Sequence, residues 1–174
     1  MAYSTVPKVR RDGVIQLIDG TGVPVTLDIA YEEGNFTFDK PGGGDSPAAQ
    51  TIVRDRGVIS TVRKGDDEPI TGSFSAFFRQ FTDGSEAGSV IDFITKAGNY
   101  SGNTSTGTTG SPYVEHYCID IKYEAEGTDF GDDADHSATL SKCVCTFSFA
   151  EGDPSAFTIN FTAYNGVSFT GPGS

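Results

Sequence analysis

Two pairs of residues in this 174-residue chain have the types and spacing of metal ligands. His116-x-Cys118 and Cys143-x-Cys145 would together supply four plausible zinc ligands. The hydrophobic pattern argues against such a site, because Cys118 falls on the polar face of its expected strand, whereas Cys143 and Cys145 fall on the apolar face of theirs. If both strands bury their apolar faces in one core, the two pairs point apart. We therefore expect buried thiols and no metal site.

An acidic stretch and two histidines are the other candidates for chemistry. The stretch contains Asp129, Asp132, Asp133 and Asp135. It lacks the alternating Asp spacing and the glycine of a calcium-binding helix–loop–helix, although binding of an incidental surface cation stays open. No Gly-x-Ser-x-Gly elbow is present, and neither His116 nor His136 stands in a recognisable triad. We expect no catalytic residue, no cofactor and no enzymatic activity, with a glycosidase-like carboxylate pair as an open alternative.

Composition limits the function further. The chain has 24 acidic and 12 basic residues, a formal net charge of -12 and a pI of about 4.3. This charge argues against tight binding to a phosphate backbone. No apolar run reaches the roughly 18 residues that a membrane span needs, so no membrane insertion is expected. The N-terminal residues show no apolar signal core, and three cysteines fit reduced thiols in a cytosol.

A β-hairpin over residues 139–165 is the strongest local pattern, and the rest of the chain must position it. Apolar residues alternate with polar ones on both arms, around the turn Glu151-Gly152-Asp153-Pro154. The apolar positions are Cys143, Cys145, Phe147, Phe149, Phe157, Ile159, Phe161 and Ala163. One face of the hairpin should therefore pack on more sheet, because a lone hairpin is marginal in water.

Other segments predict further strands and one helix. Strands are expected at residues 13–19, 23–31, 34–39, 51–64, 71–81 and 113–126. A helix should begin at Asp83, with Glu86 as its capping-box partner, and carry an apolar stripe from Val90 to Ile94. Residues 99–112 are too rich in Gly, Ser, Thr and Asn to bury.

These elements predict a single domain over residues 1–174 that is mainly β. The expected architecture is a β-sandwich or split barrel with one flanking α-helix and a long β-hairpin-like loop. That loop has Gly and Pro at residues 40–47, and the strand after it is charged. It is a candidate contact arm, with a solvated Gly-rich loop as the alternative interpretation.

The order of these parts resembles that of the tail tube proteins of long, flexible-tailed bacteriophages, and more distantly the type VI secretion tube protein. The resemblance is one of layout over nearly the whole chain, and residues 6–18, 88–96 and 157–165 carry most of it. It implies a structural virion protein. In the family, six copies form a ring whose inner strands close into one barrel, and the rings stack into a tube through which DNA passes.

The resemblance also implies which residues make contacts. The family's loop between adjacent subunits or rings corresponds to residues 36–64 here. The candidates are Asp39, Lys40, Pro41, Asp45, Arg54, Asp55, Arg56, Arg63 and Lys64. Asp120 and Glu124 are candidates for acidic groups lining the channel, since an acidic lumen would repel phosphate and let DNA slide. Self-association is also expected on physical grounds. Unpaired sheet edges need partners, and a head-to-tail contact that closes by rotation leaves no edge unpaired.

The expected partners are therefore other copies of this chain, a tape-measure protein and tail-end proteins, in a virion tail assembled in the host cytoplasm. DNA would pass without specific binding. One rival interpretation is a standalone immunoglobulin-like or carbohydrate-binding β-sandwich that grips a ligand with residues 98–112 and 128–137. Another is a different virion part, such as a decoration or tail-completion protein. The sequence leaves open the ring size, the host and whether the chain polymerises alone.

Overall fold

The computed structural model describes residues 13–29, 34–41, 48–78, 89–107, 115–125 and 135–171. β-strands dominate this part of the chain, as predicted. The strands are β1 (Gly13–Ile18), β2 (Thr26–Ile29), β3 (Gly34–Asp39), β4 (Ala48–Asp55), β5 (Val58–Asp67), β6 (Ile70–Phe77), β7 (Ile119–Ala125), β8 (His136–Ala150), β9 (Ala156–Ala163) and β10 (Val167–Thr170). One α-helix, α1 (Val90–Thr95), and a short 3-10 helix, η2 (Gly98–Tyr100), complete the described elements.

The predicted hairpin is confirmed as β8 and β9. The two strands pair antiparallel from Cys143 opposite Ala163 to Ala150 opposite Ala156. Their turn contains the predicted Asp153-Pro154, joined by a cis peptide bond. β10 continues alongside β8, with Val167 opposite Leu140. This last strand was not predicted, although Val167-Ser-Phe-Thr170 alternates over its four residues.

A β-bulge at Lys142 divides β8 into two halves. Lys142 has a φ of +57°, and its N–H donates to a carboxylate oxygen of Asp120 at 2.9 Å. Before the bulge β8 pairs with β7 and β10, and after it β8 pairs with β9. A bulge bends its strand and increases the local twist. β8 consequently runs from one sheet into another.

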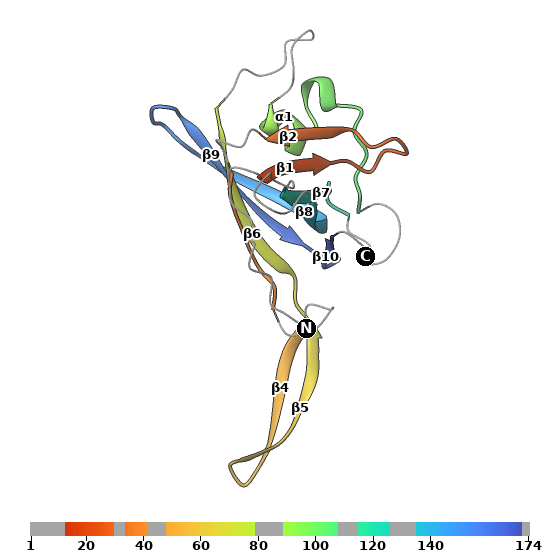
Figure 1. Ribbon diagram of the computed structural model, residues 1–174, viewed down its shortest axis with the longest axis vertical. Coiled ribbons are helices and arrows are strands. Elements are labelled where there is room, and N and C mark those ends of the chain that lie inside the picture. Colours follow the sequence, from red (N-terminus) through yellow and green to blue (C-terminus); the bar gives the residue numbers. More distant parts are fainter. Residues whose placement is uncertain are drawn as a thin grey trace.

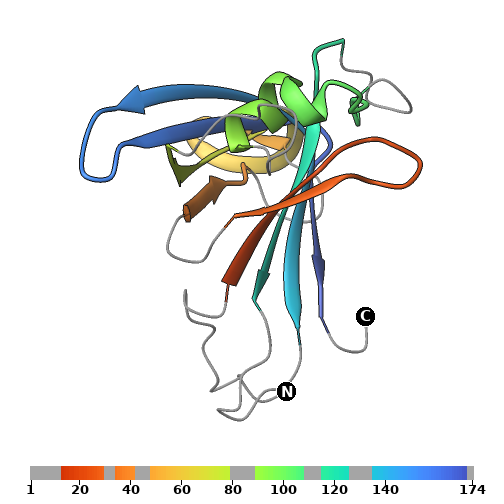
Figure 2. The ribbon, with the colours of Figure 1, turned by 90° about the horizontal axis from the view of Figure 1, so that it is seen from above.

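The eight strands of the body form one hydrogen-bonded sheet, which folds at β8 into two halves that enclose the core and that we call the first and the second sheet. The first sheet has the order β2-β1-β7-β8-β10, and the second has the order β8-β9-β6-β3. In Figure 2 the blue β8–β9 hairpin extends sideways, while red β1, teal β7 and dark-blue β10 run down the view. The described strands do not close into a barrel, and the arrangement is consistent with the predicted β-sandwich with one helix.

The core lies where the apolar faces of both sheets meet. Leu17, Ile121 and Leu140 come from the first sheet and are fully buried. Phe74 and Ile159 from the second sheet are also buried in the same cluster. Alternation along each strand explains the pattern, because every second side chain points to the core face.

Helix α1 starts later than the sequence suggested. Ser89 has extended backbone angles, its hydroxyl accepts the N–H of Asp92 at 3.2 Å, and its own N–H donates to the Asp92 carboxylate at 3.1 Å. The helix is therefore capped by Ser89 and Asp92, whereas the predicted capping residues Asp83 and Glu86 lie outside the described residues. The apolar stripe is confirmed, because Phe93 is completely buried in the core cluster.

Part of the polar segment 99–112 is buried, contrary to expectation. Asn103 and Ser105 are 4% and 9% exposed. The carboxylate of Asp19 fixes the segment by accepting the N–H of Thr104 at 3.0 Å and of Val25 at 2.7 Å, and also the Thr21 hydroxyl. The Asp19 carboxylate therefore supplies the hydrogen-bond acceptor that these backbone N–H groups need when the segment is buried.

The long hairpin-like loop is a two-stranded antiparallel hairpin, β4–β5, whose register shifts at two places and which projects from the body in Figure 1. Its tip is a two-residue turn in which Arg56 and Gly57 have φ angles of +47° and +87°. Positive φ at both central residues is the geometry that matches the twist of a tight hairpin. We call residues 50–64 of this hairpin the distal arm.

Candidate assembly surfaces

The distal arm exposes large apolar side chains that no other part of the described chain covers. Its strands pair only with each other. The exposed fractions are 47% for Ile52, 40% for Val53, 71% for Val58, 55% for Ile59 and 53% for Val62. An isolated two-stranded hairpin is marginal in water, and contiguous exposed apolar groups mark interaction sites. The arm is thus built to be covered by another surface.

The distal arm is also basic in an acidic chain. It contains Arg54, Arg56, Arg63 and Lys64 and a single acid, Asp55, for a net of +3. Since the whole chain has a formal net charge of -12, the remaining residues carry -15. The ion pair between Lys64 and Asp67, at 2.9 Å, joins exposed side chains and adds little stability. The charge of the arm is therefore available for a partner surface.

The predicted contact residues fall into two groups. Arg54, Asp55, Arg56, Arg63 and Lys64 lie in the distal arm. Asp39 ends β3 opposite Thr71, and Lys40 and Pro41 follow it, so these three lie where β3 and β6 lead toward the arm. Asp45 lies outside the described residues.

The second sheet has an unpaired strand at each end within the described residues. Among these residues β3 pairs only with β6, and β8 from Val144 to Ala150 pairs only with β9. Because adjacent strands are antiparallel throughout, β3 and β8 run in opposite directions. An edge of β3 can therefore meet an edge of β8 from another copy and continue the antiparallel pattern.

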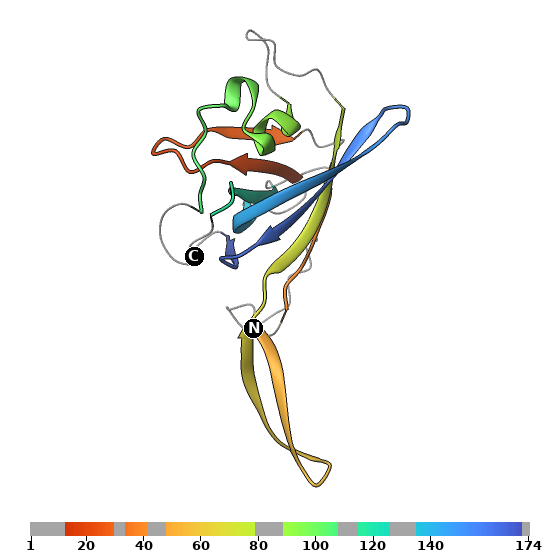
Figure 3. The same cartoon turned by 180° about the vertical axis from the view of Figure 1, so that it is seen from behind.

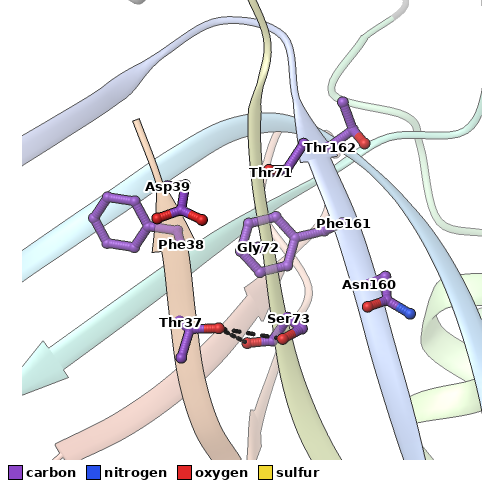
Figure 4. A pocket seen from close by; sticks show the side chains of 9 residues that line it. All are labelled: Thr37, Phe38, Asp39, Thr71, Gly72, Ser73, Asn160, Phe161 and Thr162. Carbon is purple, nitrogen blue, oxygen red and sulfur yellow. Dashed lines mark hydrogen bonds between the residues drawn. The ribbon is translucent and has the colours of Figure 1, made fainter. Parts of the chain in front are cut away.

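The outer face of the second sheet is lined by neutral polar groups. Thr37, Ser73, Asn160 and Thr146 lie directly opposite one another across its four strands. The Thr37 and Ser73 hydroxyls are 3.2 Å apart (Figure 4). A pocket of about 320 Å³ opens here, lined by Thr37, Phe38, Asp39, Thr71, Gly72, Ser73, Asn160, Phe161 and Thr162. Asp39 is its one ionisable lining group, so the pocket holds no acid–base or nucleophile pair.

Asp120 and Glu124 lie on β7 in the first sheet, away from this polar face. Asp120 accepts the N–H of Lys142 at the bulge, so the fold already uses its carboxylate. Glu124 forms an ion pair with Lys122, and both side chains are about one-third exposed or less. The structure does not bring these two carboxylates together with the predicted contact residues.

Cys118 and Cys143 are buried, as expected, and Cys145 is half-buried, but one prediction about the thiols was wrong. Cys118 is completely buried, although the pattern placed it on a polar face. It precedes β7, and its N–H donates to the Ser105 hydroxyl at 2.9 Å. Burial raises the pKa of Cys143 well above its usual value and that of Cys145 to about 12. The thiols therefore stay protonated at neutral pH, and the described residues contain no cluster suited to a metal ion.

The sequence did not identify a cluster of aromatic side chains at the far end of β8–β9. Phe78, Phe147 and Phe149 are 47%, 46% and 53% exposed and surround the buried Phe157. The available signal was length, because β8 has 15 residues, whereas β7 and β10, which pair with its first part, have 7 and 4. Where the apolar alternation of a strand continues beyond the end of a neighbouring strand, the apolar face of that extension lacks a facing sheet to cover it.

Among the described residues, no helix combines the length and the apolar character needed to cross a bilayer. No protein-family model matches the chain, and no curated protein matches it either.

Three solved structures have a similar fold. A chain in the baseplate of the anti-feeding prophage has a TM-score of 0.56 at 10% identity, over 98% of this chain and 100% of that one. A chain in the extended sheath–tube complex of the PVC extracellular contractile injection system has a TM-score of 0.55 at 12% identity, over 97% and 99%. A chain in the sheath/tube terminator of that system has a TM-score of 0.54 at 14% identity, over 97% and 99%. These likenesses support the expected tail-tube-like fold.

Proposed function

We propose that this chain is a structural subunit of a phage-tail-like particle, in which copies associate into rings and the rings stack into a tube. The observation that carries the proposal is the second sheet, which ends in an unpaired strand on both sides in the described residues. The exposed distal arm supports it. So do the three structures of similar fold described above, one from the baseplate of the anti-feeding prophage and two from an extracellular contractile injection system.

Ring closure follows from the directions of the two edge strands. β3 of one copy would pair with β8 of the next, and repetition of this head-to-tail contact by rotation closes a ring without free edges. The free edges of the first sheet, on β2 and β10, have only four residues each. Because the second sheet offers longer edges, it is the better candidate for the ring wall.

This ring contact also determines which face of the second sheet points into the channel. The first sheet packs on the apolar face of the second, so the bulk of each subunit must lie outside a ring formed by the second sheet. Its uncovered face, with Thr37, Ser73 and Asn160, would then face the channel. Hydroxyl and amide groups hold water without a fixed charge, which suits DNA that passes without binding.

A channel lined by charged groups would require the ring to close through the first sheet instead of the second. Asp120 and Glu124 would line the channel if the first sheet closed the ring through β2 and β10. That role therefore stays a prediction. The hexameric ring, the tape-measure and tail-end partners, and a place in a virion tail assembled in the host cytoplasm are likewise part of the proposal.

A cross-linking experiment tests the ring contact. In a Cys145→Ser background, which removes the half-buried native thiol, the variant Thr37→Cys/Thr146→Cys places one new thiol near each edge, while native Cys118 and Cys143 remain buried. Short bismaleimide linkers should produce a ladder of covalent oligomers from the double variant and no ladder from either single variant. Negative-stain images of the unmodified protein should show rings or tubes.

Two results would overturn the proposal. A monomer at high concentration with no ladder would favour the standalone binding module instead. Dimers from a single-cysteine variant would show that equivalent edges meet, which does not build a ring of many copies.

A further inference from the structure

The exposed large apolar side chains of the described residues concentrate in two places. Of the twelve that are exposed, five lie in the distal arm and three lie near the turn between β8 and β9. We call the second place the aromatic end and define it by Phe78, Phe147, Phe149 and Phe157 with the turn residues Glu151 and Asp153. Contiguous exposed apolar side chains of this kind mark surfaces that bind a partner.

The aromatic end is a preformed surface. The Phe157 ring centroid lies 5.5 Å from that of Phe78, 5.7 Å from that of Phe147 and 5.2 Å from that of Phe149. Phe78 and Phe149 also meet edge to face at 5.7 Å. Aromatic side chains held in this way lose little conformational entropy when a partner covers them, which favours tight binding per unit area.

The two patches are complementary in charge. Four basic side chains flank the apolar groups of the distal arm, while exposed Glu151 and Asp153 flank the rings of the aromatic end. Complementary charges around an apolar contact select the partner and fix its orientation. Copies of one patch would instead bring like charges together.

The two patches cannot meet within one molecule. The distal arm projects at one end of the long axis, and the β8–β9 hairpin projects toward the other end, as Figures 1 and 3 both show. A contact between them must therefore join two copies, and it joins different surfaces on each. Such a contact propagates along a line of subunits.

We propose that the distal arm of one copy docks on the aromatic end of a second copy and thereby joins one ring to the next. The inference rests on the proposed self-association and names the surface that receives the arm. Ile52, Val53, Val58, Ile59 and Val62 supply the apolar side chains of the contact. Arg54, Arg56 and Arg63 approach Glu151 and Asp153.

Mixing two assembly-defective variants tests the contact. Ile59→Ser damages the arm and leaves the aromatic end intact, whereas Phe149→Ser does the reverse. Both side chains are exposed in the single chain, so both variants should fold. Each variant alone should form rings but no stacked tubes, with the critical concentration for stacking raised about tenfold or more. Mixed together, they should form two-ring complexes, because an intact arm then meets an intact aromatic end.

The controls use equally exposed side chains elsewhere. Phe169→Ser on β10 and Val23→Ser beside β2 remove side chains that are 68% and 84% exposed, and both variants should stack like the unmodified protein. Stacking by Phe149→Ser alone would overturn the inference, as would mixtures that never pair. If Phe149→Ser stacks while the Thr37/Thr146 cross-link ladder persists, only the docking contact is wrong, whereas absence of that ladder without the stacking substitutions would contradict the proposed ring itself.

Discussion

At the scale of single residues, the buried Asp19 has the largest structural effect for its size. It is 2% exposed and connects the turn after β1 to a segment 85 residues later. Burial would raise the pKa of its carboxyl, but hydrogen bonds from Thr21, Thr104 and Val25 outweigh burial and hold the pKa below its usual value of 3.8. The charged carboxylate is therefore the form that the fold requires.

This shift predicts a stability that depends on pH. Because the folded-state pKa is depressed, the contribution of Asp19 is present above the unfolded-state pKa and is lost as the pH falls through the folded-state value. Asp19→Asn should lower the free energy of unfolding by about 1 to 3 kcal/mol at pH 7. The difference from wild type should shrink between about pH 5 and pH 3 in urea titrations. A difference that stays constant would contradict this, and exposed Asp28→Asn is the control.

Phe161 predicts a large cost of truncation. It is 2% exposed, and its ring stacks on Phe36 at 5.7 Å and lies over Gly72, where an added Cβ would be 2.3 Å from its ring. Phe161→Ala should lower the free energy of unfolding by about 3 to 5 kcal/mol, because it leaves a cavity between β9, β6 and β3. Urea titration measures the loss. Phe169→Ala, at a side chain that is 68% exposed, should change stability by less than about 0.5 kcal/mol.

At the scale of elements, the arm is separable from the core. Gln50 and Lys64 are directly opposite in β4–β5, so replacing residues 51–63 by Asn-Gly gives a two-residue turn. The shortened chain should keep its thermal midpoint within a few degrees, because the removed side chains contact no core residue. It should no longer form stacked assemblies in light-scattering and microscopy assays. Tubes from the shortened chain would show that the arm is not the stacking element.

The sequence predicted the elements in which alternation is strict. The β8–β9 hairpin, β1 and β3 follow from period-two patterns with clear turns. The arm was harder to read, because its strands are exposed on both faces and apolar residues therefore occur on both. A strand with no face toward the core shows no alternation of apolar and polar residues, so its register cannot be inferred from the sequence.

Contacts distant in the sequence explain what could not be predicted. Cys118 and Ser105 are buried because residues 103–106 pack beside the start of β7, which no local pattern reveals. The bulge at Lys142 depends on Asp120, which lies 22 residues earlier. The charged arm residues were predicted as contacts from the charge pattern and the resemblance, and this stays a prediction, whereas the aromatic end required knowing where the neighbouring strands stop.

At the scale of the whole molecule, charge predicts how assembly responds to salt. Copies with a net charge of -12 repel one another, while the basic arm attracts the acidic remainder at short range. The Debye length falls from about 30 Å at 0.01 M to about 10 Å at 0.1 M and about 3 Å at 1 M. Assembly should therefore be strongest at intermediate NaCl, where repulsion between bodies is screened but contact attraction persists.

Light scattering over a NaCl series measures this optimum. Arg54→Gln/Arg63→Gln should remove the fall at high salt and leave the rise from low salt unchanged, because only the attraction depends on these side chains. A steady increase with salt in the unmodified protein would show that the arm charges do not contribute.

The strand β8 belongs to both sheets, with the bulge at Lys142 between its halves. Any force that pulls the two sheets apart is therefore applied along the length of one continuous strand. Its ladders on β7 and β9 are then loaded in shear, so many hydrogen bonds must break together instead of opening one at a time. We therefore expect the subunit to resist stretching along this strand.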